Sequence, residues 1–213
     1  MPAAVVFDFN GTLSDDEPIM CRIVSELLAE HGRPISEREY YDELAGHTDE
    51  EIARRMLGPG HPRLAEFVDQ RVARYCELVS DGSSICDEVR AVVRYASERV
   101  PVTIVSGATR AEIEPVVEAA GLTPFLHGIV TADDVAAGKP DPDGYLRALA
   151  LLDGGLAAGD VLAFEDTEVG VASAKAAGLR CVGVTRTLGA ARLAQADELI
   201  PQLDLAAIRR LLG

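Results

Sequence analysis

The apolar positions of this 213-residue chain follow two different patterns. Residues 3–9 form a short β-branched and aromatic run that ends in turn-type residues, which predicts a buried strand with Asp8 at its carboxyl end. From residue 17 to about residue 80, apolar positions recur at helical spacing without any strand pattern. The first helix is expected over 17–31, closed by Gly32.

A capping-box pattern at Ser36 and a further helix-capping residue, Thr48, divide the helical segment. Ser36 is followed three residues later by Glu39 before "YYDELAG", and Thr48 precedes "DEEIARRML". The run "PRLAEFVDQRVARYCELV" also has helical spacing. Each of these runs is predicted to be helical.

After "SDGSS" the pattern changes to alternating strands and helices. Strands are expected at "VTIVS", 128–131, "VLAFE", "RCVGV" and 198–200, and helices at 87–99, 109–120, 142–152 and 167–177, with a short helix before the last strand and a helix at the C-terminus. This alternation predicts an α/β fold, a doubly wound, Rossmann-like parallel sheet with helices on both faces. We expect a core domain of residues 1–14 and 83–213 and an inserted all-α domain of residues 15–82.

Composition narrows the class of protein. A hydrophobic content of 48% suffices for a packed core, and a formal net charge of −15 argues against a nucleic-acid partner. The apolar runs are too short to cross a bilayer and no secretory signal is recognisable, so we expect a cytoplasmic protein with no membrane partner. The four cysteines lack a C-x-x-C pair and indicate ordinary thiols: Cys21, Cys76, Cys86 and Cys181.

Polar residues follow several of the predicted strands. Asp8 ends the first strand, Ser106-Gly107 follows "VTIV", Glu165-Asp166 follows "VLAF", and Lys139 lies in the loop "AAGKPDPDGY". The carboxyl ends of parallel strands meet at one edge of a sheet, where sites form in such folds. We therefore expect these side chains to form one site.

The residue types at this edge favour phosphoryl transfer. Three carboxylates repel one another unless a cation neutralises them, and oxygen ligands suit Mg²⁺, so Asp8, Glu165 and Asp166 are predicted to hold it. The Ser106 hydroxyl, the Lys139 ammonium and backbone N–H groups of the turn 10–12 are donors for an anionic substrate. Asp8 can then attack phosphorus and form an aspartyl phosphate.

The order of motifs resembles one family. D-x-x-G-T, S-G, G-K-P-D-P and E-D-T followed by "GVASAKAAG" resemble the haloacid-dehalogenase superfamily, in its β-phosphoglucomutase-like and phosphoglycolate-phosphatase-like branch. The resemblance spans essentially the whole chain, and the helical insertion matches the cap domain of that branch. It implies a hydrolase for a small phosphorylated metabolite, either a monomer or a homodimer.

The resemblance also implies a role for each matching residue. Asp8 is the nucleophile and a metal ligand, Ser106 binds the phosphoryl group, Lys139 stabilises its charge, and Asp166 with Glu165 holds Mg²⁺. The backbone carbonyl of Asn10 supplies a further metal ligand. The expected phosphate and substrate contacts are Gly11, Thr12, Ser106, Gly107, Lys139, His47 and Thr48.

Asn10, the only asparagine in the chain, departs from the family pattern. That position usually holds a second aspartate that acts as general acid and base, and losing such a group costs about 10²–10⁴-fold in rate. Three explanations remain open: a substrate whose leaving group needs little protonation, a site disabled naturally or by substitution, or a chain that binds phosphate without turnover.

A replacement proton carrier is one hypothesis for the cap. The segment 46–49 resembles the family's substrate-selecting cap loop, and His47 there is suited to titrate near neutral pH, although an exposed loop histidine is the favoured interpretation. Asp15 and Asp16 are interpreted as the hinge into the cap and the start of its first helix.

Missing residues argue against related activities. No lysine precedes Lys139, which excludes the Schiff-base chemistry of phosphonate-cleaving relatives. Ile19 and Met20 stand where β-phosphoglucomutase relatives usually carry a histidine, which counts against a mutase. Haloacid dehalogenation stays a less favoured alternative, since Asn10 replaces the tyrosine of D-x-Y-G-T and Glu165-Asp166 is intact.

Overall fold

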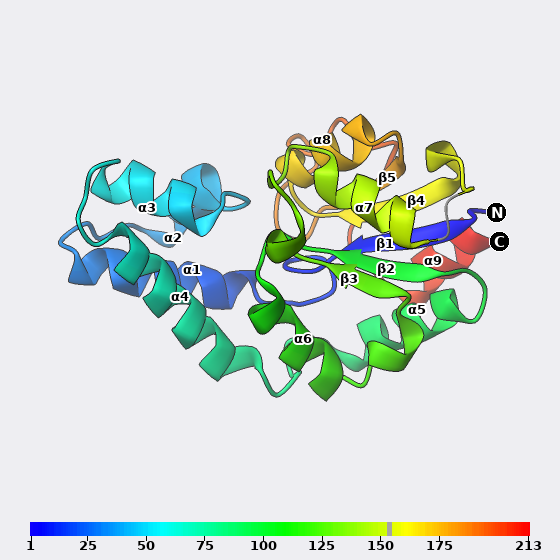
Figure 1. The fold of residues 1–213 in the computed structure, drawn as a ribbon, viewed down its shortest axis with the longest axis horizontal. Helices are drawn as coiled ribbons and strands as arrows, with labels where there is room; N and C mark the ends of the chain where they lie inside the picture. The colour runs from blue at the N-terminus through cyan, green and yellow to red at the C-terminus, as the bar shows by residue number, and fades with distance from the viewer. Residues whose placement is uncertain (153–154) are drawn as a thin grey trace.

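The computed structural model describes residues 1–152 and 155–213 as a doubly wound α/β fold with a helical insertion (Figure 1). Its six strands form one sheet in the order β3-β2-β1-β4-β5-β6, and every neighbouring pair is parallel. The strands are β1 Ala4–Asp8, β2 Val102–Val105, β3 Gly128–Val130, β4 Val161–Glu165, β5 Arg180–Val184 and β6 Glu198–Ile200. The predicted fold class is confirmed.

Helices cover both faces of the sheet. In Figure 1, α7 and α8 lie above the strands, and α5, α6 and α9 lie below them. Alternate residues of β1 serve the two faces, because Val5 and Phe7 pack in one apolar cluster and Ala4 and Val6 in the other. The helices are α5 Asp87–Ser97, α6 Arg110–Ala119, α7 Asp143–Leu151, α8 Glu168–Ala176 and α9 Leu205–Leu212.

The insertion between β1 and α5 is helical throughout its regular elements. It contains α1 Glu17–Glu30, α2 Glu37–Glu39, the π-helix η1 Tyr40–Leu44, α3 Asp49–Leu57 and α4 Leu64–Val79. The predicted capping box at Ser36 is present. The predicted cap at Thr48 is also present, and with Glu51 it forms a full capping box. The π-helical turn was not predicted. It buries Tyr40 and Leu44, so tertiary packing accompanies the departure from α-helical geometry.

Two groups of contacts join the insertion to the core. Arg71 of α4 forms a buried ion pair with Glu112 of α6 in the core, and a pair with Asp49 within the insertion holds the same guanidinium. On the other side, the Arg192 guanidinium donates to the carbonyl oxygen of Tyr41 at 3.0 Å. The insertion is therefore anchored on both sides of the sheet's carboxyl edge.

The prediction of a short helix between β5 and β6 is wrong. That segment forms successive turns, with hydrogen bonds from Arg192 N to Gly189 O and from Ala196 N to Leu193 O, both 3.0 Å. Leu188 and Leu193 are buried in different apolar clusters, so the chain must pass from one packing environment to the other within a few residues. One straight helix could not place Leu188 in one apolar cluster and Leu193 in the other.

Three short 3-10 helices complete the described elements, at Thr123–Phe125, Ala132–Asp134 and Ala158–Asp160. Within residues 1–152 and 155–213, no helix combines the length and the apolar character needed to cross a membrane.

Candidate active site

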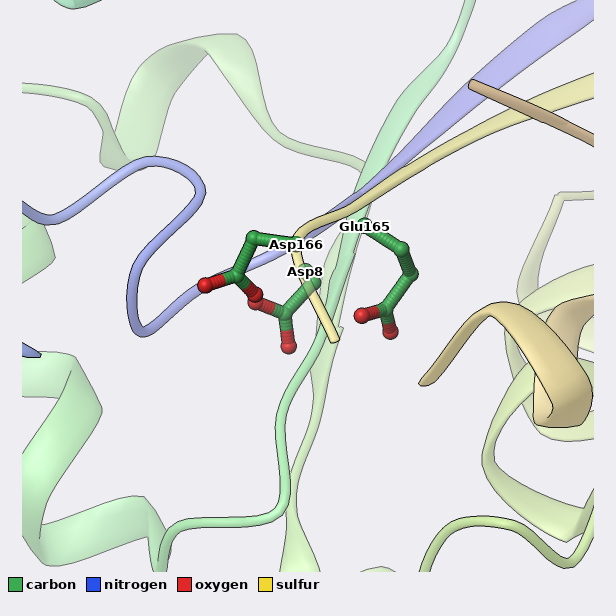
Figure 2. Close-up of side chains that lie close together, drawn as sticks. All are labelled: Asp8, Glu165 and Asp166. Atoms are coloured by element: carbon green, nitrogen blue, oxygen red, sulfur yellow. The ribbon is translucent and has the colours of Figure 1, made fainter. Parts of the chain in front are cut away.

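The register of the central strands brings the predicted residues to one edge. Asp8 pairs with Val105, the last residue of β2, and Phe7 pairs with Phe164 of β4. The residues after these strand ends therefore meet at the same level. Figure 2 shows the carboxylates of Asp8 and Asp166 side by side, with that of Glu165 directed toward the same region.

The three carboxylates form a compact buried cluster. One oxygen from each lies within 4.8 Å of the others, and the three residues are at most 6% exposed. Asp8 Oδ2, Glu165 Oε2 and Asp166 Oδ2 have no hydrogen-bond partner among the described residues. Burying charged oxygens without hydrogen-bond donors costs free energy, and a bound cation would offset that cost. The cluster therefore has the oxygen ligands of a cation site.

Lys139 is the cation of this cluster. Its Nζ lies 2.5 Å from Asp8 Oδ1 and 2.6 Å from Glu165 Oε1. Burial alone would lower the pKa of Lys139, but the two carboxylates outweigh that effect and raise its pKa above the usual value. Lys139 therefore stays charged, and one positive charge faces three carboxyl groups.

Burial also changes the acids. It raises the pKa of Glu165 to about 7, against the opposing effect of Lys139, and raises that of Asp166 well above its ordinary value. The Tyr145 hydroxyl donates to Glu165 Oε1 and was not found by sequence reasoning. Burial is the largest cause of both raised pKa values, and the nearby Asp8 carboxylate adds to it.

Two glycines allow the cluster to form. A Cβ on Gly11, whose φ is +73°, would lie 1.9 Å from Asp166 Oδ2. A Cβ on Gly170, at the start of α8, would lie 1.8 Å from Glu165 Oε2. Gly170 was not singled out from the sequence, although it stands in the "GVASAKAAG" run. Both acids thus occupy space that any side chain would fill.

The groups expected to donate hydrogen bonds to phosphate have different partners in the structure. Ser106 Oγ lies beside the Asn10 amide and accepts from Ala108 N at 3.1 Å, while Gly107 is exposed. The Thr12 hydroxyl donates to Asp166 Oδ1 at 3.4 Å, and the Gly11 N–H donates to Asp16 Oδ1 at 3.1 Å. The Ser106 hydroxyl donates to Asn10 Oδ1 at 3.2 Å. Both hydroxyls and the Gly11 N–H thus have hydrogen-bond partners within the protein.

Asn10 is held from two sides. Its Nδ2 donates to Asp16 Oδ2 at 2.9 Å and to the Tyr75 hydroxyl at 3.0 Å, and its Oδ1 accepts from Ser106 Oγ at 3.2 Å. Asp16 and Tyr75 were missed as site residues. Burial raises the pKa of Asp16.

His47 and Thr48 lie in the cap loop but do not contact the carboxylate cluster. His47 Nδ1 is 3.4 Å from Glu51 Oε2, and Thr48 Oγ1 caps α3 by accepting from Glu51 N. The neighbouring Gly46 does approach the core, since a Cβ there would lie 3.2 Å from Thr167 Cγ2. The loop therefore reaches the start of α8, directly after Asp166.

A cleft of about 320 Å³ opens between the insertion and the core. It is lined by Asp15, Glu17, Pro18, Glu37, Tyr41, Arg186 and Thr187. Thr187 lies next to the carboxylate cluster, because a Cβ on Gly11 would lie 2.8 Å from Thr187 Oγ1 and 1.9 Å from Asp166 Oδ2. The sequence analysis missed Arg186 and Thr187. They come after the end of β5, so the strand-end argument that found Glu165 and Asp166 at the end of β4 would have found them as well.

Comparison with known proteins gives a consistent assignment. A family model described as haloacid dehalogenase-like hydrolase matches residues 2–178. The chain is 30% identical to validoxylamine A 7'-phosphate phosphatase from Streptomyces hygroscopicus subsp. limoneus, over 95% of each chain. It is 27% identical to phosphoglycolate phosphatase from Yersinia pestis, over 85% of this chain and 80% of that one.

A solved structure extends the likeness to three dimensions. A variant of CbbY from Rhodobacter sphaeroides in complex with xylulose-(1,5)bisphosphate superimposes with a TM-score of 0.82 and 26% identity, over 95% of each chain. The match of the family model to most of the chain and the common fold lead to one conclusion. The chain belongs to the haloacid dehalogenase-like hydrolase family.

Proposed function

We propose that the protein is a Mg²⁺-dependent phosphatase that removes phosphate from a small phosphorylated metabolite through an aspartyl phosphate on Asp8. The carboxylate cluster carries this proposal. Three buried acids meet at the carboxyl edge of the sheet, each has an oxygen without a donor, and a single lysine bridges two of them. The phosphatases among the relatives support the same reaction class.

The donor set suits Mg²⁺. Asp8, Glu165, Asp166 and the backbone carbonyl of Asn10 would hold the ion, since Mg²⁺ prefers oxygen ligands and these acids lack other partners. When bound, Mg²⁺ would neutralise the carboxylates and the charge of the phosphoryl group. We also propose that residues 15–82 act as a cap over a core made of residues 1–14 and 83–213.

The chain's own residues account for the reaction steps. An Asp8 oxygen attacks phosphorus, the bond from phosphorus to the leaving oxygen breaks, and Lys139 and Ser106 stabilise the transferring group. The leaving oxygen departs with the electron pair of that bond and takes its proton from water. Water then attacks the aspartyl phosphate, the bond from phosphorus to Asp8 breaks, and both protons of that water leave with the product phosphate. Asn10 carries no proton in either step.

The cleft favours a particular kind of leaving group. Among the described residues on its wall, the acids are Asp15, Glu17 and Glu37, while Arg186 is the one cation. The Arg186 guanidinium already donates to the carbonyl oxygen of Gly11 at 2.8 Å and lies 3.8 Å from Asp15. A second phosphate or a carboxylate would lack a partner there. We propose a leaving group that bears hydroxyl or ammonium groups.

The first test is phosphate release from acetyl phosphate and p-nitrophenyl phosphate, with Mg²⁺ and with a chelator. We expect Mg²⁺-dependent release by the parent chain and none by Asp8→Ala. Brief reaction with labelled acetyl phosphate should leave label on the peptide that contains Asp8. Mg²⁺-dependent binding of phosphate without release would instead show a phosphate-binding protein.

A second test addresses the leaving group. We expect glucosamine 6-phosphate to have a higher kcat/KM than glucose 6-phosphate, and 2-phosphoglycolate to be the poorest of the three. Glu37→Gln should reduce the preference for the amino sugar, while Asp87→Asn, a fully exposed change outside the cleft, should preserve it. Equal rates for all three substrates in the parent would contradict this assignment.

A further inference from the structure

Asp16 stands where a helix cap is expected but does not cap the helix. It occupies the N-cap position of α1, and its side chain makes no hydrogen bond to the first turn of that helix. The residue is 0% exposed. Its carboxylate instead turns back to the chain before it and accepts from Asn10 Nδ2, Gly11 N and the Tyr75 hydroxyl. The usual structural role of an aspartate at this position is therefore unused.

These contacts determine which way the Asn10 amide faces. Its nitrogen donates to Asp16 and to Tyr75, both on the side of the cap, and its oxygen accepts from Ser106. A rotated amide would place its oxygen against the Asp16 carboxylate, with no donor between them. Asp16 and Tyr75 thus hold the amide nitrogen of Asn10, and its amide oxygen faces the proposed phosphoryl site.

We propose that Asp16 is the positioning residue that presents the Asn10 carbonyl oxygen to the reaction site, and that the amide at position 10 and the carboxylate at position 16 are one interdependent pair. This inference rests on the proposed phosphatase function. It accounts for the lone asparagine: an aspartate at position 10 would put two buried carboxylates at hydrogen-bond distance, whereas the amide supplies the donor that Asp16 requires.

The orientation also assigns a task to Asn10. Phosphoryl oxygens do not donate hydrogen bonds, so an acceptor beside Ser106 suits a group that carries a proton, which is the water that attacks the aspartyl phosphate. Asn10 then orients this water without taking its proton. Because no acid at position 10 serves the leaving group, the rate within one class of phosphate should rise as the leaving group becomes a more stable anion.

The test is a four-protein cycle with the parent, Asn10→Asp, Asp16→Asn and the double variant. In each, thermal stability is measured without metal, and kcat and KM are measured with Mg²⁺ on aryl phosphates of graded leaving-group pKa. We expect each single variant to melt several degrees lower than the parent, and the double variant to recover most of that loss. The reason is that the double variant exchanges the two groups and keeps a donor facing a carboxylate.

Kinetics distinguish positioning from mere structural support. We expect Asp16→Asn to lower kcat by about 10-fold or more at nearly constant KM, and Asn10→Asp alone to give no gain. The double variant should recover turnover and depend less steeply on leaving-group pKa, because its carboxyl group then stands at position 10. Tyr75→Phe should keep the fold and lower kcat less than Asp16→Asn.

Two results would overturn the pairing. One is a higher turnover for Asn10→Asp alone with an unchanged melting temperature, and the other is additive effects around the cycle. If no protein in the cycle releases phosphate, the proposed function fails. The melting temperatures would still decide whether positions 10 and 16 are coupled.

Discussion

The carboxylate cluster at the carboxyl ends of β1 and β4 and the Asp16 carboxylate before α1 differ in their partners. Asp8, Glu165 and Asp166 each keep an oxygen without a donor. Asp16, equally buried, receives hydrogen bonds from a backbone N–H, an amide and a phenol. Burial is therefore common to both regions, and the supply of donors is what separates them.

This difference indicates separate functions for the two regions. A buried carboxylate that is fully supplied with donors stabilises one local geometry and has little need of a ligand. A group of buried carboxylates that lacks donors is stable only when a cation or a proton compensates it. This contrast supports the proposals that the cluster binds Mg²⁺ and that Asp16 positions Asn10 beside it.

Removing the only cation of the cluster should give the largest effect. Lys139→Met leaves Asp8 and Glu165 without their ion-pair partner, so we expect metal-free stability at neutral pH to fall by about 3–5 kcal/mol. Turnover should fall by about 10³-fold, because the charge on the transferring group is no longer balanced. Denaturant unfolding and phosphate release measure the two effects.

The chain offers a matched control for that variant. Lys175, its only other lysine, forms an exposed pair with Asp197, and Lys175→Met should change stability by less than about 1 kcal/mol. If the two variants lost stability equally, the cluster would not depend on Lys139 for compensation, and the contrast with Asp16 would fail.

Adding Mg²⁺ should compensate the cluster and leave Asp16 unaffected. At Mg²⁺ about 100 times above its Kd, binding to the folded state stabilises a protein by about 2.7 kcal/mol. We expect this gain in the parent, little gain in Asp166→Asn, and the full gain in Asp87→Asn, which removes a fully exposed carboxylate. A full gain in Asp166→Asn would place the ion elsewhere. Thermal melts with Mg²⁺ and with chelator make the comparison.

Filling the space beside Glu165 should disturb the cluster without removing any charge. Alanine normally stabilises a helix relative to glycine, but Gly170→Ala places a Cβ against Glu165 Oε2, so we expect a loss of about 1–3 kcal/mol and a weaker response to Mg²⁺. Gly159→Ala is the control, because nothing lies within 4 Å of its added Cβ. Equal melting temperatures for both variants would show that Glu165 moves aside freely.

Sequence reasoning located the cluster but missed its neighbour, for a physical reason. Asp8 and Glu165 were predicted from the ends of their strands and Lys139 from its loop motif. Such residues can be predicted because the carboxyl ends of parallel strands meet at one edge of the sheet, where sites form. Asp16 has an ordinary interpretation as a helix cap, and Tyr75 lies 65 residues from Asn10. Helical periodicity marks Tyr75 as a core residue and says nothing about where its hydroxyl points.

The fold likewise contains elements that local sequence patterns predict and elements that depend on tertiary packing. The elements of the sheet and the helix caps at Ser36 and Thr48 follow from local patterns and are confirmed. The π-helical turn at Tyr40–Leu44 and the turns around Leu193 follow from which side chains become buried, and that depends on distant elements. Local spacing predicted ordinary helices in both places.

The smallest effect should appear at Glu17, a partly buried acid that belongs to neither group. Burial raises its pKa to about 7, and it accepts a hydrogen bond from Tyr40 at 2.8 Å. A raised folded-state pKa favours the protonated form, so this contribution to stability is complete below pH 4.5 and is lost as pH rises through about 7. Glu17→Gln should therefore match the parent near pH 4 and exceed its stability by roughly 1–2 kcal/mol near pH 8. Denaturant unfolding across this range without metal measures the difference. A stability difference that does not change with pH would show that burial at the cap junction does not raise the pKa of Glu17.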